Sequence, residues 1–207
     1  MNLRLIRLGI LGTALGLGFL AIATYYVRST PKSYVQDTTS HLPDLGGPFR
    51  LVDQFGKTRT TQEFRGKYIL VYFGYSYCPD VCPMGLQNIS AALQSLGTDL
   101  GNIVPIFITI DPERDDVKNL NLYAQNWHSS FIFLTGTQEQ LDPVMKAYKV
   151  YSAKVNPEGT DADYIMDHSA LIYLLNREGK FVDFFPHTTN PAQIANKIRK
   201  HLLDEMK

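Results

Sequence analysis

Two cysteines, Cys78 and Cys82, are the residues of this sequence best suited to chemistry. They are the only cysteines among 207 residues, and they frame the segment Cys-Pro-Asp-Val-Cys-Pro. A thiolate is the form of cysteine that attacks a disulfide or binds a metal. If the segment is one helical turn, the two sulfurs share a face and the Cα atoms lie about 6 Å apart, within disulfide range. The pair can therefore close a disulfide or hold one soft ion.

The spacing also limits which role the two cysteines can have. A purely structural disulfide is disfavoured, because closing so short a loop removes little entropy from the unfolded chain. Structural zinc needs four ligands, and the sequence has no second cysteine pair and no His-x₃-His motif. Two thiolates with one imidazole suit a low-coordinate copper ion instead. A third ligand must then come from a histidine.

Five histidines could supply that ligand: His41, His128, His168, His187 and His201. The first lies near the N-terminus, the second at a predicted helix end and the last on the predicted terminal helix. His168 precedes an apolar strand with Asp167 beside it, whereas His187 lies in a loop after a strand. Spacing alone ranks His168 slightly ahead of His187 and leaves the choice open, since a lone histidine is more often structural.

The cysteine segment lies between two predicted elements that would hold it in place. The apolar run Tyr68–Gly74 predicts a central strand covered on both faces. After the cysteines, a stripe from Leu86 to Leu96 predicts a helix that ends at Gly97. N–H groups at a helix N-terminus favour anions, so we expect either thiol to have a lowered pKa.

The remaining elements predict an α/β fold with a mixed sheet between helices. Further strands are expected at 49–53, 58–60, 103–110, 131–134, 150–155, 170–175 and 180–185, and further helices after Thr60, at 117–127, after Thr137 and after Asn190. Pro143 falls inside the helix after Thr137, so that helix either kinks there or begins late, with Asp142 as its cap.

The sequence of the N-terminal segment predicts a membrane anchor. Residues 8–27 are uncharged and mostly apolar, and about 20 such residues are enough for a helix to cross a bilayer. We expect an anchor over 1–28, a polar tether over 29–45 and a globular domain over 46–207. A cleaved signal peptide is the alternative, because Ala21-Ile22-Ala23 resembles a cleavage site. Either way the domain is exported, and a bacterial cell envelope is favoured over an organelle.

The charge balance excludes one class of partner. The chain carries 20 basic and 20 acidic residues, but the first 32 residues hold four basic residues and no acidic one. The rest of the chain therefore has a net charge of −4 and offers no basic surface for a nucleic acid.

Several motifs together resemble the Sco/SenC family of copper-binding, thioredoxin-like proteins of respiratory membranes. The resemblance covers roughly residues 44–203. It rests on Gly46-Gly47-Pro48-Phe49, Tyr72–Tyr75 leading into the cysteine segment, Asp111-Pro112-Glu113-Arg114-Asp115, Leu134–Thr137, Tyr164–His168 and Gly179–Asp183.

The resemblance implies a thioredoxin-like fold and a complete ligand set. Cys78 and Cys82 would be the thiolate ligands and His168 the imidazole ligand of one copper ion per chain. Asp80 and Asp167 would contact the ligands and adjust the properties of the thiolates and the imidazole. It is equally consistent with the sequence that Asp80 is only a carboxylate at the start of a helix and Asp167 only a solvated acid in a loop. We expect Met84 and Met166 to pack, and the segment from Asp111 to Asp115 to be a loop near the site rather than a metal cluster.

The function implied by the resemblance is that of a metallochaperone rather than an enzyme. It would help to assemble the copper A centre of cytochrome c oxidase subunit II, or load another cuproenzyme, from a single-pass anchor in the bacterial inner membrane with its domain in the periplasm. Copper binding requires reduced cysteines, so a thiol reductant is an expected partner. The alternative is a thiol–disulfide oxidoreductase that keeps the cysteines of a partner reduced, with Cys78 attacking and Cys82 resolving.

Overall fold

The computed structural model describes residues 44–156 and 164–205 of the chain. Its centre is a seven-stranded sheet in the order β2-β1-β5-β4-β3-β8-β9. The strands of this sheet are β1 (Arg50–Asp53), β2 (Thr58–Thr60), β3 (Tyr68–Gly74), β4 (Ile103–Thr109), β5 (Ile132–Thr135), β8 (Leu171–Leu175) and β9 (Phe181–Pro186). Because β3 runs parallel to β4 and antiparallel to β8, the sheet is mixed, as the sequence predicted.

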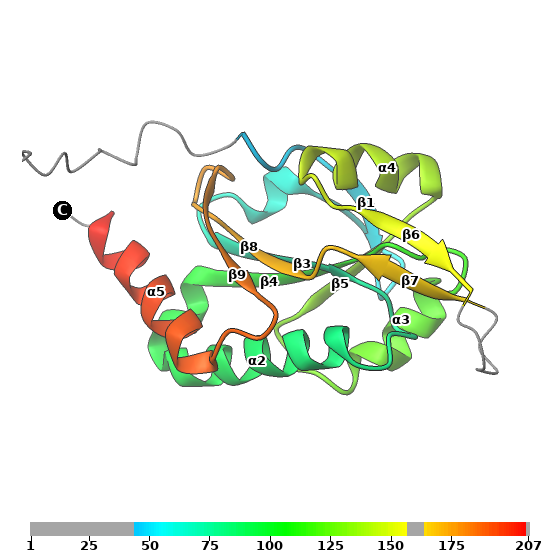
Figure 1. Cartoon of the computed structure of the whole chain (residues 1–207). Helices are drawn as coiled ribbons and strands as arrows, with labels where there is room; N and C mark the ends of the chain where they lie inside the picture. Colours follow the sequence, from blue (N-terminus) through cyan, green and yellow to red (C-terminus); the bar gives the residue numbers. More distant parts are fainter. Residues whose placement is uncertain (1–43, 157–163, 206–207) are drawn as a thin grey trace, which may run out of the picture. The chain divides into compact units, whose positions relative to one another are not determined.

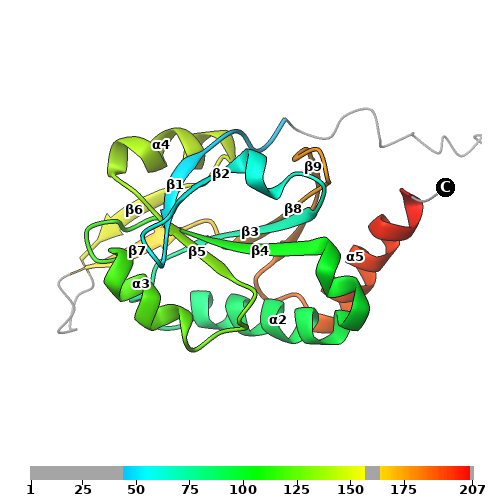
Figure 2. The same ribbon diagram turned by 180° about the vertical axis from the view of Figure 1, so that it is seen from behind.

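Helices cover both faces of this sheet. They are α2 (Val81–Leu96), α3 (Val117–Ala124), α4 (Gln138–Ala147) and α5 (Pro191–Asp204), with short 3₁₀ turns η2 (Thr61–Phe64) and η3 (Gly97–Asn102). Figure 1 and the reverse view in Figure 2 show α2 and α5 on one face and α4 on the other. The predicted stripe on α2 is buried, and α2 ends at Gly97, whose φ of 57° suits a residue without a side chain.

The central strands bring two loops to the same edge of the sheet. All seven residues of β3 are buried, which explains its unbroken apolar sequence. In the parallel pairing of β3 with β4, Gly74 lies opposite Thr109. The loop after Gly74 carries the cysteines and the loop after Thr109 carries Asp111–Asp115, so the two loops are neighbours.

A second, two-stranded sheet stands apart from the first. It consists of β6 (Ser152–Val155) and β7 (Ile165–His168), which pair antiparallel so that Ser152 lies opposite His168. We call β6 and β7 the ribbon. A strand at 150–155 was predicted, but β7 was not, because the short sequence Ile-Met-Asp-His contains no apolar run. β7 and its pairing with β6 are therefore the main feature of the fold that the sequence did not predict.

Two helices differ from their predicted form. α3 ends at Ala124 rather than Trp127, and single hydrogen-bonded turns carry the chain onward from it. α4 begins at Gln138, with reciprocal capping between Thr137 and Gln140, so the alternative of a late start at Asp142 is wrong. Pro143 stays inside α4 on its exposed side.

Candidate metal centre

Cys78 and Cys82 lie at the junction of β3 and α2, but only Cys82 belongs to the helix. Cys78 closes a turn before it, in which its N–H donates to the carbonyl oxygen of Tyr75 at 3.3 Å. The two cysteines therefore do not share one helical turn, which was the condition under which their sulfurs would lie on the same helix face. The sulfurs meet because the N–H of Cys82, at the start of α2, donates to the Cys78 sulfur at 3.3 Å. The Cys78 sulfur thus accepts a hydrogen bond that an N-cap side chain would normally accept.

A glycine on β3 makes room for the buried sulfur of Cys82. A Cβ atom added at Gly74 would lie 2.8 Å from the Cys82 sulfur and 2.8 Å from Cε2 of Phe107. Both distances are too short for non-bonded atoms, so only glycine allows α2 to approach the strand this closely. Cys82 is completely buried and Cys78 is 5% exposed.

His168 reaches the cysteines from the end of the ribbon. Its Nε2 lies 3.3 Å from the Cys82 sulfur, and its Nδ1 lies 3.1 Å from the carbonyl oxygen of Ser169. When Nδ1–H donates to that carbonyl, Nε2 keeps its lone pair and can bind a metal. The ring of Tyr75 packs edge-on against the imidazole at 6.0 Å between centroids. Cys78, Cys82 and His168 thus place their three donor atoms within 4.8 Å of one another.

The two thiols have opposite proton affinities. A hydrogen bond from the Cys82 thiol lowers the pKa of Cys78 despite burial, and main-chain N–H groups, including that of Cys82, lower it further. The negative sulfur of Cys78 and burial raise the pKa of Cys82. The expectation of a lowered pKa is confirmed for Cys78 and is wrong for Cys82. Cys78 is therefore the more acidic of the two thiols.

The other described histidines lie in separate surroundings. His128 contacts the hydroxyl of Ser130 at 2.8 Å, and His201 contacts the carboxylate of Asp183 at 3.2 Å. The main-chain N–H of His187 donates to the carbonyl oxygen of Ala170. Within residues 44–156 and 164–205, no group of three or more potential ligands includes any of them. His41 lies outside the described residues.

The predicted supporting residues take up different positions. The side chains of Asp80 and Asp167 are both exposed, and among the described residues neither carboxylate is hydrogen-bonded to the sulfurs or the imidazole. Their tuning role stays a prediction. Met166 is buried, as expected of a packing residue, whereas Met84 is 39% exposed.

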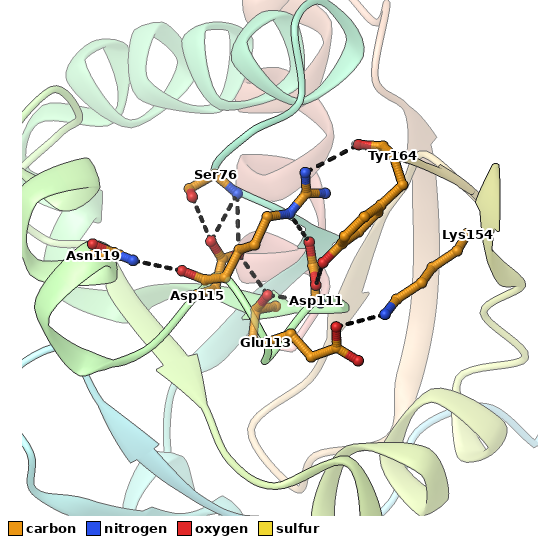
Figure 3. A network of polar contacts seen from close by, with 9 residues as sticks. Ser76, Asp111, Glu113, Asp115, Asn119, Lys154 and Tyr164 are labelled. Carbon is orange, nitrogen blue, oxygen red and sulfur yellow. Dashed lines mark hydrogen bonds and ion pairs between the residues drawn. The ribbon is translucent and has the colours of Figure 1, made fainter. Parts of the chain in front are cut away.

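The loop from Asp111 to Asp115 connects the cysteine segment to the ribbon (Figure 3). Asp115 accepts hydrogen bonds from the main-chain N–H of Ser76 at 3.0 Å and from its hydroxyl. On the other side, the hydroxyl of Tyr164 donates to Asp111 at 2.8 Å. The expectation of a loop beside the site agrees with these contacts. The pairing of Ser76 with Asp115 and the fit of Gly74 were not predicted, because both depend on how β3 and β4 align.

No helix of the described residues is long and apolar enough to cross a bilayer. The predicted anchor over 1–28, most of the tether and the alternative signal peptide lie outside the described residues.

Comparison with known proteins gives consistent matches over this domain. The SCO1/SenC family model matches residues 37–203. The mitochondrial SCO2 homologue of Danio rerio is 40% identical over 158 residues, which are 75% of this chain and 56% of the relative. The mitochondrial SCO2 homologue of Homo sapiens is 36% identical over 207 residues, which are 98% of this chain and 76% of the relative. The chain thus spans little more than half of the first relative.

Solved structures match the fold as well as the sequence. Arabidopsis thaliana ScoI with copper bound has a TM-score of 0.72 and 36% identity, covering 77% of this chain and 99% of that one. Bradyrhizobium japonicum ScoI with copper bound has a TM-score of 0.70 and 40% identity, covering 75% and 98%. Both relatives carry copper on the fold that this chain adopts.

Proposed function

Because the chain belongs to the SCO1/SenC family, we propose that it is a copper chaperone that helps to assemble the copper A centre of cytochrome c oxidase subunit II, or loads another cuproenzyme. In this proposal copper is the cargo, and one ion binds to each chain. Copper-bound relatives from a plant and a bacterium support the choice of metal.

The convergence of Cys78, Cys82 and His168 is the observation that carries this proposal. Two sulfurs and an imidazole form a soft donor set, which favours copper over the hard ions that prefer oxygen ligands. Three protein ligands leave one side of the ion open, and ligands of an acceptor can enter there. Cys78 is the more exposed of the two cysteines, so it faces an incoming partner more directly than Cys82 does.

The anchor and the tether complete the proposed delivery mechanism. A chain held at the periplasmic face of the bacterial inner membrane meets a membrane-bound acceptor on one surface, which raises their effective concentration. Delivery also requires reduced cysteines, so a thiol reductant must act on the chain whenever Cys78 and Cys82 become oxidised.

Copper loading of the reduced full-length protein in detergent tests this proposal. We expect about one copper ion per wild-type chain and a large loss of retained copper in Cys78→Ser and His168→Ala, because each variant removes one of the three donors. His187→Ala is the matched control and should retain copper like the wild type. Wild-type copper stoichiometry and nitrogen coordination in His168→Ala would refute the ligand set.

The opposite proton affinities of the cysteines favour a second candidate function, thiol–disulfide exchange. The Cys78 thiolate would attack a disulfide of a partner, form a mixed disulfide and release one partner thiol. Cys82 would then lose its proton, attack the Cys78 sulfur and release the second partner thiol. Two electrons would pass to the partner, and the Cys78–Cys82 disulfide would await an external thiol reductant.

His168→Ala separates the two functions, because thiol exchange forms and breaks bonds only at the cysteine sulfurs, whereas the proposed copper site needs the imidazole as a ligand. If this variant still reduces a model disulfide but does not retain copper, the protein has both activities and only copper binding requires the imidazole. If the wild-type protein does not reduce the model disulfide, the second candidate function is excluded.

A further inference from the structure

We propose that Arg114 is a positioning residue that fixes His168 against the two cysteine sulfurs. The inference deepens the proposed copper site and rests on it for its functional meaning. The reason for it is that His168 ends the ribbon, whereas Cys78 and Cys82 lie in the turn and the helix that follow β3 of the main sheet, and Arg114 contacts the segments next to both.

Arg114 holds the start of β7 through several contacts. Its Nη1 donates to the carbonyl oxygen of Tyr164 at 3.0 Å, and its guanidinium carbon lies 3.7 Å from the centre of the Tyr164 ring. Its Nε pairs with Asp111 at 2.5 Å, while the Tyr164 hydroxyl donates to the other oxygen of the same carboxylate. Tyr164 lies four residues before His168, so these contacts fix the strand that carries the imidazole.

The same guanidinium also faces the cysteine segment. It lies 5.5 Å from the ring centre of Tyr75 and 5.0 Å from that of Tyr77, the residue directly before Cys78. Tyr75 in turn packs edge-on against the His168 ring. The guanidinium of Arg114 therefore lies against three tyrosine rings. Two of these tyrosines come just before Cys78 in the sequence, and the third, Tyr164, comes directly before β7.

The ribbon depends on such side-chain contacts because its strands pair only with each other among the described strands. A second polar link joins it to the same loop, where Lys154 of β6 pairs with Glu113 at 2.6 Å (Figure 3). That pair is 46% and 64% exposed, and exposed pairs contribute little. Arg114 is 20% exposed and Asp111 only 1%, so this buried link holds the ribbon more firmly.

The chemistry of these contacts requires arginine. A guanidinium is planar, so it can stack on aromatic rings while it donates hydrogen bonds from its edge to a carboxylate and a carbonyl. An ammonium group keeps the charge but cannot stack and donate in the same fixed geometry. We therefore expect lysine at this position to restore only part of the effect.

The test compares Arg114→Met with Arg177→Met in the reduced full-length protein. Arg177 is a matched control, because it makes the same three kinds of contact away from the site. It pairs with the carboxylate of Glu205, donates to the carbonyl oxygen of Gly66 and lies over the ring of Tyr68. We expect Arg114→Met to weaken the nitrogen signal of bound copper and to release copper about tenfold faster, as is usual when a residue behind a metal ligand is lost. Arg177→Met should change neither value, and Arg114→Lys should lie between Arg114→Met and the wild type.

A second readout needs no copper. In the metal-free reduced protein, Arg114→Met should shift the His168 imidazole signals in an NMR spectrum, and Arg177→Met should leave them in place. If wild-type copper binding does not depend on His168, the proposed function fails, but this spectrum still tests the positioning.

Unchanged imidazole signals and an unchanged rate of copper release in folded Arg114→Met would overturn the inference. If that variant does not fold, Tyr164→Leu tests the same link, because it removes the stacked ring and keeps the carbonyl oxygen. Wild-type values in Tyr164→Leu would then overturn the inference as well.

Discussion

The two cysteines of the candidate centre differ in protonation although they lie four residues apart. The Cys78 sulfur accepts hydrogen bonds from the Cys82 thiol and from main-chain N–H groups, which lower the pKa of Cys78 to about 4. Cys82 is fully buried beside that negative sulfur, so its pKa is raised. Metal binding as two thiolates must therefore remove the proton from Cys82.

This asymmetry predicts a proton count for copper loading. At pH 7 we expect about one proton to be released for each copper ion bound, because one thiol must ionise. The apparent affinity should rise about tenfold for each pH unit near neutrality, until the pKa of Cys82 is reached. Loading with Cu(I) in weakly buffered solution with a pH indicator measures the release. A release of two protons would mean that Cys78 is also protonated at pH 7, and no release would mean that Cys82 is already a thiolate.

The close packing around Gly74 lets us predict the effect of adding one methyl group next to the site. Gly74→Ala places a Cβ atom 2.8 Å from the Cys82 sulfur, so α2 and its cysteine must move away from β3. We expect a loss of about 1–3 kcal/mol in the free energy of unfolding, as is typical of overpacking, together with faster copper release. Thermal unfolding and copper retention measure the two effects. Gly101→Ala is a control for the added methyl group, because nothing lies within 4 Å of its Cβ position; equal copper retention in the two variants would contradict the close fit.

At the scale of helices and strands, the sequence predicted the parts whose pattern is local. β3 and α2 follow from an apolar run and an apolar stripe, and these two elements place both cysteines at the edge of the sheet. β7 could not be predicted, because its position depends on pairing with β6 and on contacts with a distant loop. The choice of His168 therefore rested on the family resemblance, since the spacing of the histidines left His187 open.

The turn between β1 and β2 is an element whose stability should depend on pH. Asp53 is buried there; its Oδ1 accepts the N–H groups of Phe55 and Lys57, and its Oδ2 pairs with Arg59 at 2.8 Å. Burial raises the pKa of Asp53, but these hydrogen bonds and the charge of Arg59 outweigh it and hold the pKa below 3.8. The ionised carboxylate therefore stabilises the fold above the unfolded pKa of about 3.9, and the contribution is lost as the pH falls through the folded value.

We therefore expect Asp53→Asn to lower the free energy of unfolding by about 1–3 kcal/mol at pH 7, since it removes a hydrogen bond between charged groups. The difference from the wild type should shrink as the pH falls below 4. Denaturant unfolding at several pH values measures it. Glu63→Gln removes the exposed partner of the same arginine and should have little effect at any pH; a difference for Asp53→Asn that does not vary with pH would contradict the role of the carboxylate.

At the scale of the whole molecule, membrane attachment is the prediction that remains to be tested. Residues 8–27 carry no charge, and a span of that length and composition suits an uncleaved anchor. We expect the full chain to sediment with membranes and to resist extraction at alkaline pH, with its first residues still present by mass spectrometry. Recovery of a shortened chain in the soluble fraction would favour the cleaved signal peptide instead.

The order in which the chain is made has its own consequence. Cys82 and His168 are 86 residues apart, and they meet only when the ribbon that carries His168 has formed next to the start of α2. A nascent chain that has not yet emerged as far as His168 carries both thiols without their imidazole. If copper binds through all three side chains as proposed, capture belongs to the finished polypeptide, and during synthesis the two thiols need protection from premature oxidation.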